Sequence, residues 1–213
     1  ASTSPHPRPD SGHQRERRRL VLHVGVHVAA AIVLVAALSA GMRPLPEDIV
    51  LWLAAILAAK FPMPLPGREH DATSLVPVTL VGSALVLPWQ TAVPLIGTAV
   101  LLGRLIDKQP PRGAFYNASA SLVQTALACA AVDVVRDLLP ALDPLVVLPL
   151  AATAATIAAG LTNVALMAPV FALNGMPLAT AARMIVSADV VPHFVLGATA
   201  VAVAVLHERH PAL

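Results

Sequence analysis

Cysteine, aromatic side chains and charge are all scarce in this sequence. The chain has 1 cysteine, Cys129, which lies in an apolar run; aromatic residues make up 3% of the chain and charged residues 12%. A single cysteine excludes an internal disulfide and a cysteine-based metal cage. Because a soluble domain is typically about 25% charged, the low charge also excludes an ordinary soluble fold.

Motifs of common enzyme classes are absent as well. The sequence contains no Gly-rich phosphate-binding loop, no Gly-x-Ser-x-Gly nucleophile elbow and no His-Glu-x-x-His zinc motif. The apolar runs also lack the pair of acidic residues that an intramembrane protease or a prenyl-pyrophosphate enzyme would need. We therefore expect that the chain is not itself an enzyme and that it binds no nucleic acid.

Apolar residues are abundant instead. Hydrophobic residues make up 57% of the 213 residues, and the mean hydropathy is +0.75. A run of about 20 apolar residues crosses a bilayer as a helix. Seven segments are candidates: Leu20–Gly41, Asp48–Phe61, Ala72–Leu87, Thr91–Ile106, Ala114–Val132, Leu145–Leu173 and Ile185–Leu206. The sequence predicts an all-α, polytopic transmembrane helical bundle of about seven spans.

Arginine and lysine positions choose between topologies, because cytoplasmic loops are enriched in both residues. With seven crossings and a cytoplasmic N-terminus, 11 basic residues lie inside and 3 outside. If the short second candidate does not cross, the split becomes 7 to 7. The count favours seven crossings. It leaves open whether Ala72–Ile106 forms two spans or a re-entrant pair, since both have the same parity.

Two regions follow from this topology. Residues 1–19 are rich in Pro, Ser, His and Arg, and we expect a disordered basic cytoplasmic tail that is held near anionic lipid. Residues 20–213 would form the transmembrane helical domain. Small residues at 151–160 favour close helix packing. Five prolines within the candidate spans are expected to free backbone carbonyls and kink their helices: Pro77, Pro94, Pro149, Pro169 and Pro192.

Polar side chains inside the spans are few, and each is expensive in lipid, which makes it a functional candidate. His23 and His27 share a face of the first span, and Asp189 and His193 have the same spacing in the seventh. Asn117 and Gln124 occupy the fifth span and Asn163 the sixth. All seven fall in the cytoplasmic half of their helices, so we expect a shared depth and a pocket lined by His23, His27, Asn117, Asn163, Asp189 and His193.

Three interpretations of this pocket stay open. The two histidine-containing pairs have suitable donors for Zn²⁺ or Fe, and a facing histidine pair would ligate a haem. The structural alternative places the histidines near headgroup water and pairs Asp189 with a neighbouring basic residue. The third is a proton- or ligand-responsive pocket without a metal, because histidine titrates near physiological pH. We expect no resident cofactor.

Asn117-Ala118-Ser119 matches the acceptor pattern for N-glycosylation. The charge count places Asn117 at the cytoplasmic edge, where no glycosyltransferase would reach it. Pro110 and Pro111 bar a longer helix, so we expect Asn117 in the first turn of a helix, where its amide bonds a neighbouring helix.

The order of several segments resembles a known family. The segment Leu57–Pro66 precedes a charged turn and an apolar hairpin around Leu87-Pro88, and a basic loop runs from Arg104 to Arg112. Phe115-Tyr116-Asn117-(x)4-Leu122-(x)4-Leu127-Ala128, Thr162-Asn163-(x)2-Leu166 and Pro177-Leu178 follow. Together these resemble the polytopic N-terminal sensor regions of bacterial cyclic-di-GMP signalling proteins, which precede HD-GYP or GGDEF domains.

The resemblance implies a membrane sensor or anchor whose output enzyme follows in the cytoplasm after a further span. We expect either an excised or truncated sensor region or a stand-alone relative without its output. The implied partners are the lipid bilayer and either a cytoplasmic signalling domain or a second copy in a homodimer. Two other functions stay open: a small-solute transporter or substrate-binding membrane subunit, and a structural or assembly subunit of a membrane complex.

Overall fold

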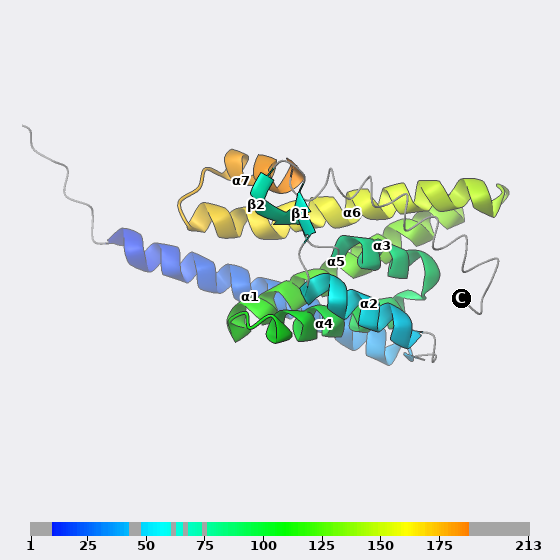
Figure 1. Cartoon of the computed structure of the whole chain (residues 1–213), viewed down its shortest axis with the longest axis horizontal. Helices are drawn as coiled ribbons and strands as arrows, with labels where there is room; N and C mark the ends of the chain where they lie inside the picture. Colours follow the sequence, from blue (N-terminus) through cyan, green and yellow to red (C-terminus); the bar gives the residue numbers. More distant parts are fainter. Residues whose placement is uncertain (1–9, 43–47, 61–62, 66–67, 74–75, 188–213) are drawn as a thin grey trace, which may run out of the picture.

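Long apolar helices dominate the computed structural model, which describes residues 10–42, 48–60, 63–65, 68–73 and 76–187 (Figure 1). The described helices are α1 Asp10–Ser39, α2 Asp48–Lys60, α3 Val76–Val86, α4 Trp89–Ile106, α5 Pro111–Leu138, α6 Pro144–Leu173 and α7 Leu178–Ile185. Two short strands, β1 Met63–Leu65 and β2 Arg68–Thr73, pair antiparallel between α2 and α3, with Met63 opposite Thr73.

The predicted helical membrane bundle is confirmed in its coarser form. Within the described residues, four helices are long and apolar enough to cross a membrane: α1 from His13, α4, α5 and α6. The other two candidates that are described, α2 and α3, have 13 and 11 residues. At about 1.5 Å per residue they would cover only about 20 and 16 Å of a hydrocarbon core about 30 Å thick. The β1–β2 hairpin between them departs from an all-helical fold.

Several predicted boundaries move. The predicted tail, residues 1–19, is helical from Asp10 onward, because Arg, Glu, Gln and Leu are good helix formers and continue α1 into the polar segment. The third candidate begins at Val76 instead of Ala72, because Ala72 and Thr73 belong to β2. Most of the last predicted span, residues 188–206, lies outside the described residues.

The prolines behave in two ways. Pro94 lies inside α4, and Pro149 and Pro169 lie inside α6, as predicted. Pro77 is the second residue of α3, where a backbone N–H has no helical partner to lose, so it frees no carbonyl and the predicted kink is wrong there. Pro111 begins α5, which confirms that the Pro-Pro pair sets the helix start. Pro192 lies outside the described residues.

Small side chains hold the core of the bundle together. Ala151, Ala152, Ala155 and Ala159 of α6 are all buried and pack in one cluster with Ala128, Cys129 and Val132 of α5. This confirms that the small-residue segment 151–160 supports close helix packing. The same cluster contains apolar residues of α2, α3 and α4.

The first helix, α1, lies at the edge of this core (Figure 1). Its buried residues, Val26, Ala30 and Ala37, are small, and α1 contacts α4, α5 and α6. Most of its large apolar side chains are exposed: Leu20, Val21, Val24, Val28, Ile32, Val35 and Leu38. In a bilayer these side chains would face lipid, so packing alone holds α1 only weakly.

The two ends of the bundle carry different charges. The α4–α5 connection, which is flanked by Arg104 and Arg112, lies on the same side as the end of α6 and the N-terminal half of α1 (Figure 1). At the opposite end, Asp133, Asp137 and Asp143 are exposed around the α5–α6 connection. The structure therefore has one basic and one mainly acidic end.

Gly103 of α4 lies where α2 approaches most closely. A Cβ added there would come within 2.5 Å of the Ala59 Cβ and 2.8 Å of the Ile56 carbonyl oxygen. We expect Gly103→Ala to lower the free energy of unfolding by about 1–3 kcal/mol, because a backbone atom cannot move aside cheaply. Unfolding by SDS in mixed micelles measures this change.

Gly82→Ala is the matched control, because nothing lies within 4 Å of a Cβ at Gly82. It should leave stability unchanged or raise it slightly, since alanine is the better helix former. Equal effects of the two substitutions would contradict the close contact between α2 and α4.

Candidate functional site

The two histidines of α1 face α5. His23 and His27 are both half-buried, and their ring centroids lie 6.4 Å apart. The ring of Tyr116, which is only 4% exposed, lies 4.7 Å from His23 and 6.3 Å from His27 between centroids. The i, i+4 spacing places both imidazoles on one helix face, and that face meets an aromatic side chain of the neighbouring helix.

Hydrogen bonds fix this group on both sides. Nδ1 of His27 and Oγ of Ser119 lie 2.8 Å apart and share a hydrogen bond, whose donor depends on the imidazole tautomer. The Tyr116 hydroxyl donates to the carbonyl oxygen of Leu166 on α6 at 2.8 Å. Pro169, in the next turn of α6, lacks the N–H that would bond the carbonyl of residue 165. Tyr116 therefore spans from the histidines to the proline-interrupted part of α6.

A second polar contact lies deeper. Nε2 of Gln124 on α5 donates to Oδ1 of Asn163 on α6 at 3.1 Å. Gln124 is 13 residues from Pro111, and Asn163 is 10 residues from Leu173, so both lie roughly 15–20 Å along their helices from the basic end. That distance is close to the middle of a bilayer core about 30 Å thick.

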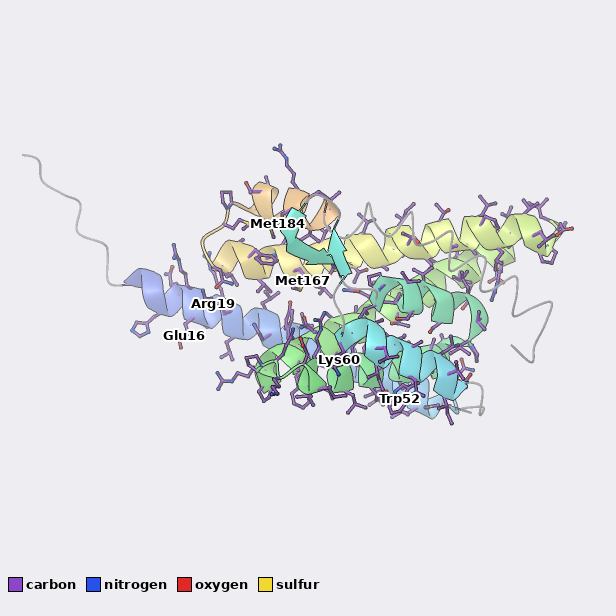
Figure 2. All side chains as sticks on the ribbon, viewed as in Figure 1. Glu16, Arg19, Trp52, Lys60, Met167 and Met184 are labelled. Atoms are coloured by element: carbon purple, nitrogen blue, oxygen red, sulfur yellow. The ribbon has the colours of Figure 1, made fainter. Side chains whose placement is uncertain are left out.

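Arg19 completes the site at the basic end. Its Nη2 donates to the carbonyl oxygen of Leu173 at 3.0 Å and to Oδ1 of Asn174 at 2.6 Å, where α6 ends. The side chain projects from the N-terminal half of α1 (Figure 2). A cavity of about 160 Å³ lies beside it, lined by Arg19, Leu22, His23, Val170, Leu173 and Asn174. An arginine at a helix C-terminus satisfies carbonyls that have no helical partner.

These contacts all lie between α1, α5 and α6. We define the polar seam as Arg19, His23, His27, Tyr116, Ser119, Gln124, Asn163 and Asn174. It runs from the basic end to about the middle of the bundle. Lipid offers no hydrogen-bonding partners. The hydrogen bonds of the seam therefore favour the association of α1, α5 and α6, in addition to apolar packing.

The predicted residues are distributed unevenly over this site. His23, His27 and Asn163 belong to the seam, but at more than one depth. Asn117 is the seventh residue of α5 and lies near the seam's basic end, yet its Nδ2 donates to Oε1 of Gln109 at 3.4 Å, in the connection that precedes its own helix. The expected bond from Asn117 to a neighbouring helix is therefore not the one observed.

Asp189 and His193 lie outside the described residues. The described chain segments contain no group of three or more His, Cys, Asp and Glu side chains that could hold a metal ion. His23 and His27 offer two imidazole donors between them.

Four members of the seam were missed from the sequence. Ser119 and Asn174 are short polar residues of a kind common in any helix or turn, so nothing marks them. Tyr116 could have been found as the one tyrosine of the chain, one turn before Ala120 on the face that carries Gln124. Arg19 was assigned to the tail, although it is one turn before His23 on the same helix face.

Comparisons of the chain with protein-family models, with curated proteins and with solved structures give no match. The evidence on function therefore comes from the residues of the chain and their arrangement.

Tyr116 provides a test of the seam. Tyr116→Phe keeps the ring against His23 but removes the bond to the Leu166 carbonyl, and should lower the free energy of unfolding by about 1 kcal/mol. Tyr116→Leu removes the ring contacts too and should cost more. SDS titration of both variants gives the comparison, and a phenylalanine variant as stable as wild type would contradict a structural role for the hydroxyl.

Proposed function

We propose that this chain is a multi-pass sensor or anchor module of a bacterial inner (plasma) membrane, and that its polar seam receives the signal. The observation that carries the proposal is the half-buried pair His23 and His27, which packs against Tyr116 and in which His27 is hydrogen-bonded to Ser119. Titratable groups within a membrane span are expensive and are functional candidates for that reason. Histidine is the side chain whose charge changes between about pH 5 and 8.

Protonation would change how α1 sits on α5. Neutral imidazoles fit beside the Tyr116 ring, and that of His27 is hydrogen-bonded to Ser119. Two imidazolium groups with centroids 6.4 Å apart would repel each other, in surroundings that lower the dielectric constant. In the described residues, the side chains that face the pair from α5 are Tyr116 and Ser119, and Arg19 shares a cavity with His23. None of these supplies a negative charge.

The position of α1 suits it for passing on such a change. Few of its residues are buried: a small apolar cluster around Ala30 and Ala37 attaches its C-terminal half, and the seam attaches its N-terminal half. α1 is therefore the helix whose attachment a proton or a small polar ligand would alter most. In the proposed orientation its N-terminal half is cytoplasmic, because the basic end contains Arg19, Arg104, Lys108 and Arg112.

We further propose seven crossings with the N-terminus inside. Helices α1, α4, α5 and α6 are long enough for four of them. The short helices α2 and α3, joined by the β1–β2 hairpin, would together lead the chain from the outer end towards the cytoplasmic side and back. Because α4 alone is long enough to cross, α2 and α3 are better candidates for a re-entrant pair than α3 and α4. A re-entrant α2–α3 pair would leave five crossings with the same orientation of the N-terminus.

The family resemblance supports a signalling role and implies that catalysis belongs to a cytoplasmic signalling domain, with this chain not itself an enzyme. A homodimer would be a second route for a signal across the membrane.

A small-solute carrier is the second candidate function, favoured by the Gln124–Asn163 pair near mid-depth. We rank it lower because the described cavity on the seam, about 160 Å³, lies at the basic end.

The proposal predicts that acid loosens α1. Spin labels at Val24→Cys on α1 and Leu161→Cys on α6, in a Cys129→Ala background, should show a broader distance distribution at pH 5 than at pH 8. Double electron–electron resonance on the labelled protein in nanodiscs measures the distances.

His23→Gln with His27→Gln should abolish the response, because glutamine stays neutral. His13→Gln is the matched control, because His13 is exposed on the same helix and outside the seam. A wild-type distribution that does not change with pH, or a response that persists in the double variant, would rule out the histidine pair as a proton sensor.

Orientation has its own test. In a Cys129→Ala background, a membrane-impermeant maleimide should label Leu142→Cys, in the α5–α6 connection, in intact spheroplasts. Asp107→Cys, in the α4–α5 connection, should react only after permeabilisation. Labelling of Asp107→Cys alone in intact spheroplasts would reverse the proposed orientation.

A further inference from the structure

A second hollow at the basic end is much more apolar than the seam. It lies between α1, α6 and α7 and has a volume of about 520 Å³, within the roughly 300–1,000 Å³ of small-molecule sites. Its apolar lining includes Leu22 of α1 with Pro169, Ala172 and Leu173 of α6. Arg17 and Arg18 of α1 are its two charged lining residues.

Helix geometry explains the shape of this groove. On α1 the lining residues Arg17, Arg18, Val21 and Leu22 are one turn apart, so the basic pair lies directly N-terminal to the apolar pair on one face. On the proposed orientation the arginines would be at headgroup level and the apolar residues at the level of the acyl chains. Leu178, at the start of α7, closes the groove on the third side and is 57% exposed.

In the proposed orientation, α7 would lie at the cytoplasmic surface of the membrane. It buries Ala181 and Ile185 in a cluster with Ala168 of α6 and exposes Arg183 on another face. Met167 of α6 and Met184 of α7 mark the two adjoining helices (Figure 2). The exposed Arg183 of α7 adds a basic side chain at this end, and basic side chains at a cytoplasmic surface attract anionic lipid.

The chemistry of the groove indicates an amphiphile with a negative head. An apolar surface at the acyl level of a bilayer would be covered by hydrocarbon, and arginine binds phosphate through several N–H donors. Anionic lipids accumulate near basic segments at the cytoplasmic surface. We propose that the groove binds one anionic phospholipid of the bilayer, with an acyl chain on Leu22, Ala172 and Leu173 and its phosphate at Arg17 and Arg18.

This lipid site adjoins the seam without depending on it. Leu22 and Leu173 line both the groove and the 160 Å³ cavity that contains Arg19 and His23. A lipid in the groove would therefore press on the two leucines that separate it from the seam and would fasten α1 to α6. The site does not require the histidines to titrate, so it can stand or fall separately from the proposed function.

Native mass spectrometry of the full chain tests the site. Released from nanodiscs that contain equal amounts of phosphatidylglycerol and phosphatidylcholine, the wild type should retain one phosphatidylglycerol in preference. Arg17→Gln and Arg18→Gln should each reduce its retention about fivefold and leave phosphatidylcholine unchanged. Arg15→Gln removes the same charge from the same helix outside the groove and is the matched control. Glycerol phosphate, which has no acyl chain, should not compete.

Filling the groove is a second, charge-neutral test. Ala172→Trp should abolish selective retention, whereas Ala179→Trp, on the exposed part of α7, should not. If Arg15→Gln and Arg17→Gln reduce the retention of phosphatidylglycerol equally, the lipid is attracted by the overall positive charge of the helix, and the proposed site is wrong. A wild-type chain that retains neither lipid, or that appears as a lipid-free dimer, would overturn it too, and in the latter case would show that a second copy covers the groove.

Discussion

A hydrogen-bonding group inside a bilayer has to find its partner within the protein, and the rest of this structure depends on that constraint. The Tyr116 hydroxyl bonds a carbonyl of α6, Gln124 bonds Asn163, and His27 bonds Ser119. Each of these bonds joins two different helices. The same scarcity of polar residues that defines the composition therefore determines which helices α1, α5 and α6 must touch, and in which register.

Alanine packing provides the remaining contacts, and it is distributed differently. Helices α2 to α6 contribute to one buried cluster in which small residues let backbones approach closely, and Gly103 allows α4 to approach the backbone of α2. The attachment of α1 is more polar and less buried. The bundle thus combines a tightly packed part with one helix whose attachment includes titratable and charged side chains beside a small apolar cluster.

The sequence predicted α2 and α6 to within one residue at each end, but it placed ends of α1, α3 and α5 several residues from where they lie. A run such as Leu145–Leu173 matches α6 almost to the residue, because length, apolar content and the flanking Asp143-Pro144 all agree. Ala72 and Thr73 were placed in a span but belong to β2, since a short apolar segment does not distinguish strand from helix. Asp10–Arg19 looked like a tail because apolar periodicity says nothing about a polar extension of a helix.

The site was predicted in part for a similar physical reason. His23, His27 and Asn163 stood out because polar residues in a span are rare. Their partners did not, because which helices are neighbours is decided by packing over long sequence distances: Arg19 and Asn174 are 155 residues apart in the chain. Asn117 was expected to bond another helix, but its side-chain amide donates to the nearer Oε1 of Gln109.

The contact between Arg19 and the end of α6 has a mechanical consequence. The residues it holds, Leu173 and Asn174, are the point at which the chain leaves α6 and turns towards α7. The Arg19 guanidinium thus connects α1 to the turn that leads into α7. A rotation of α1 about its long axis would break the bonds to Leu173 and Asn174, whereas the apolar cluster of Ala168, Ala181 and Ile185 would still hold α7 on α6.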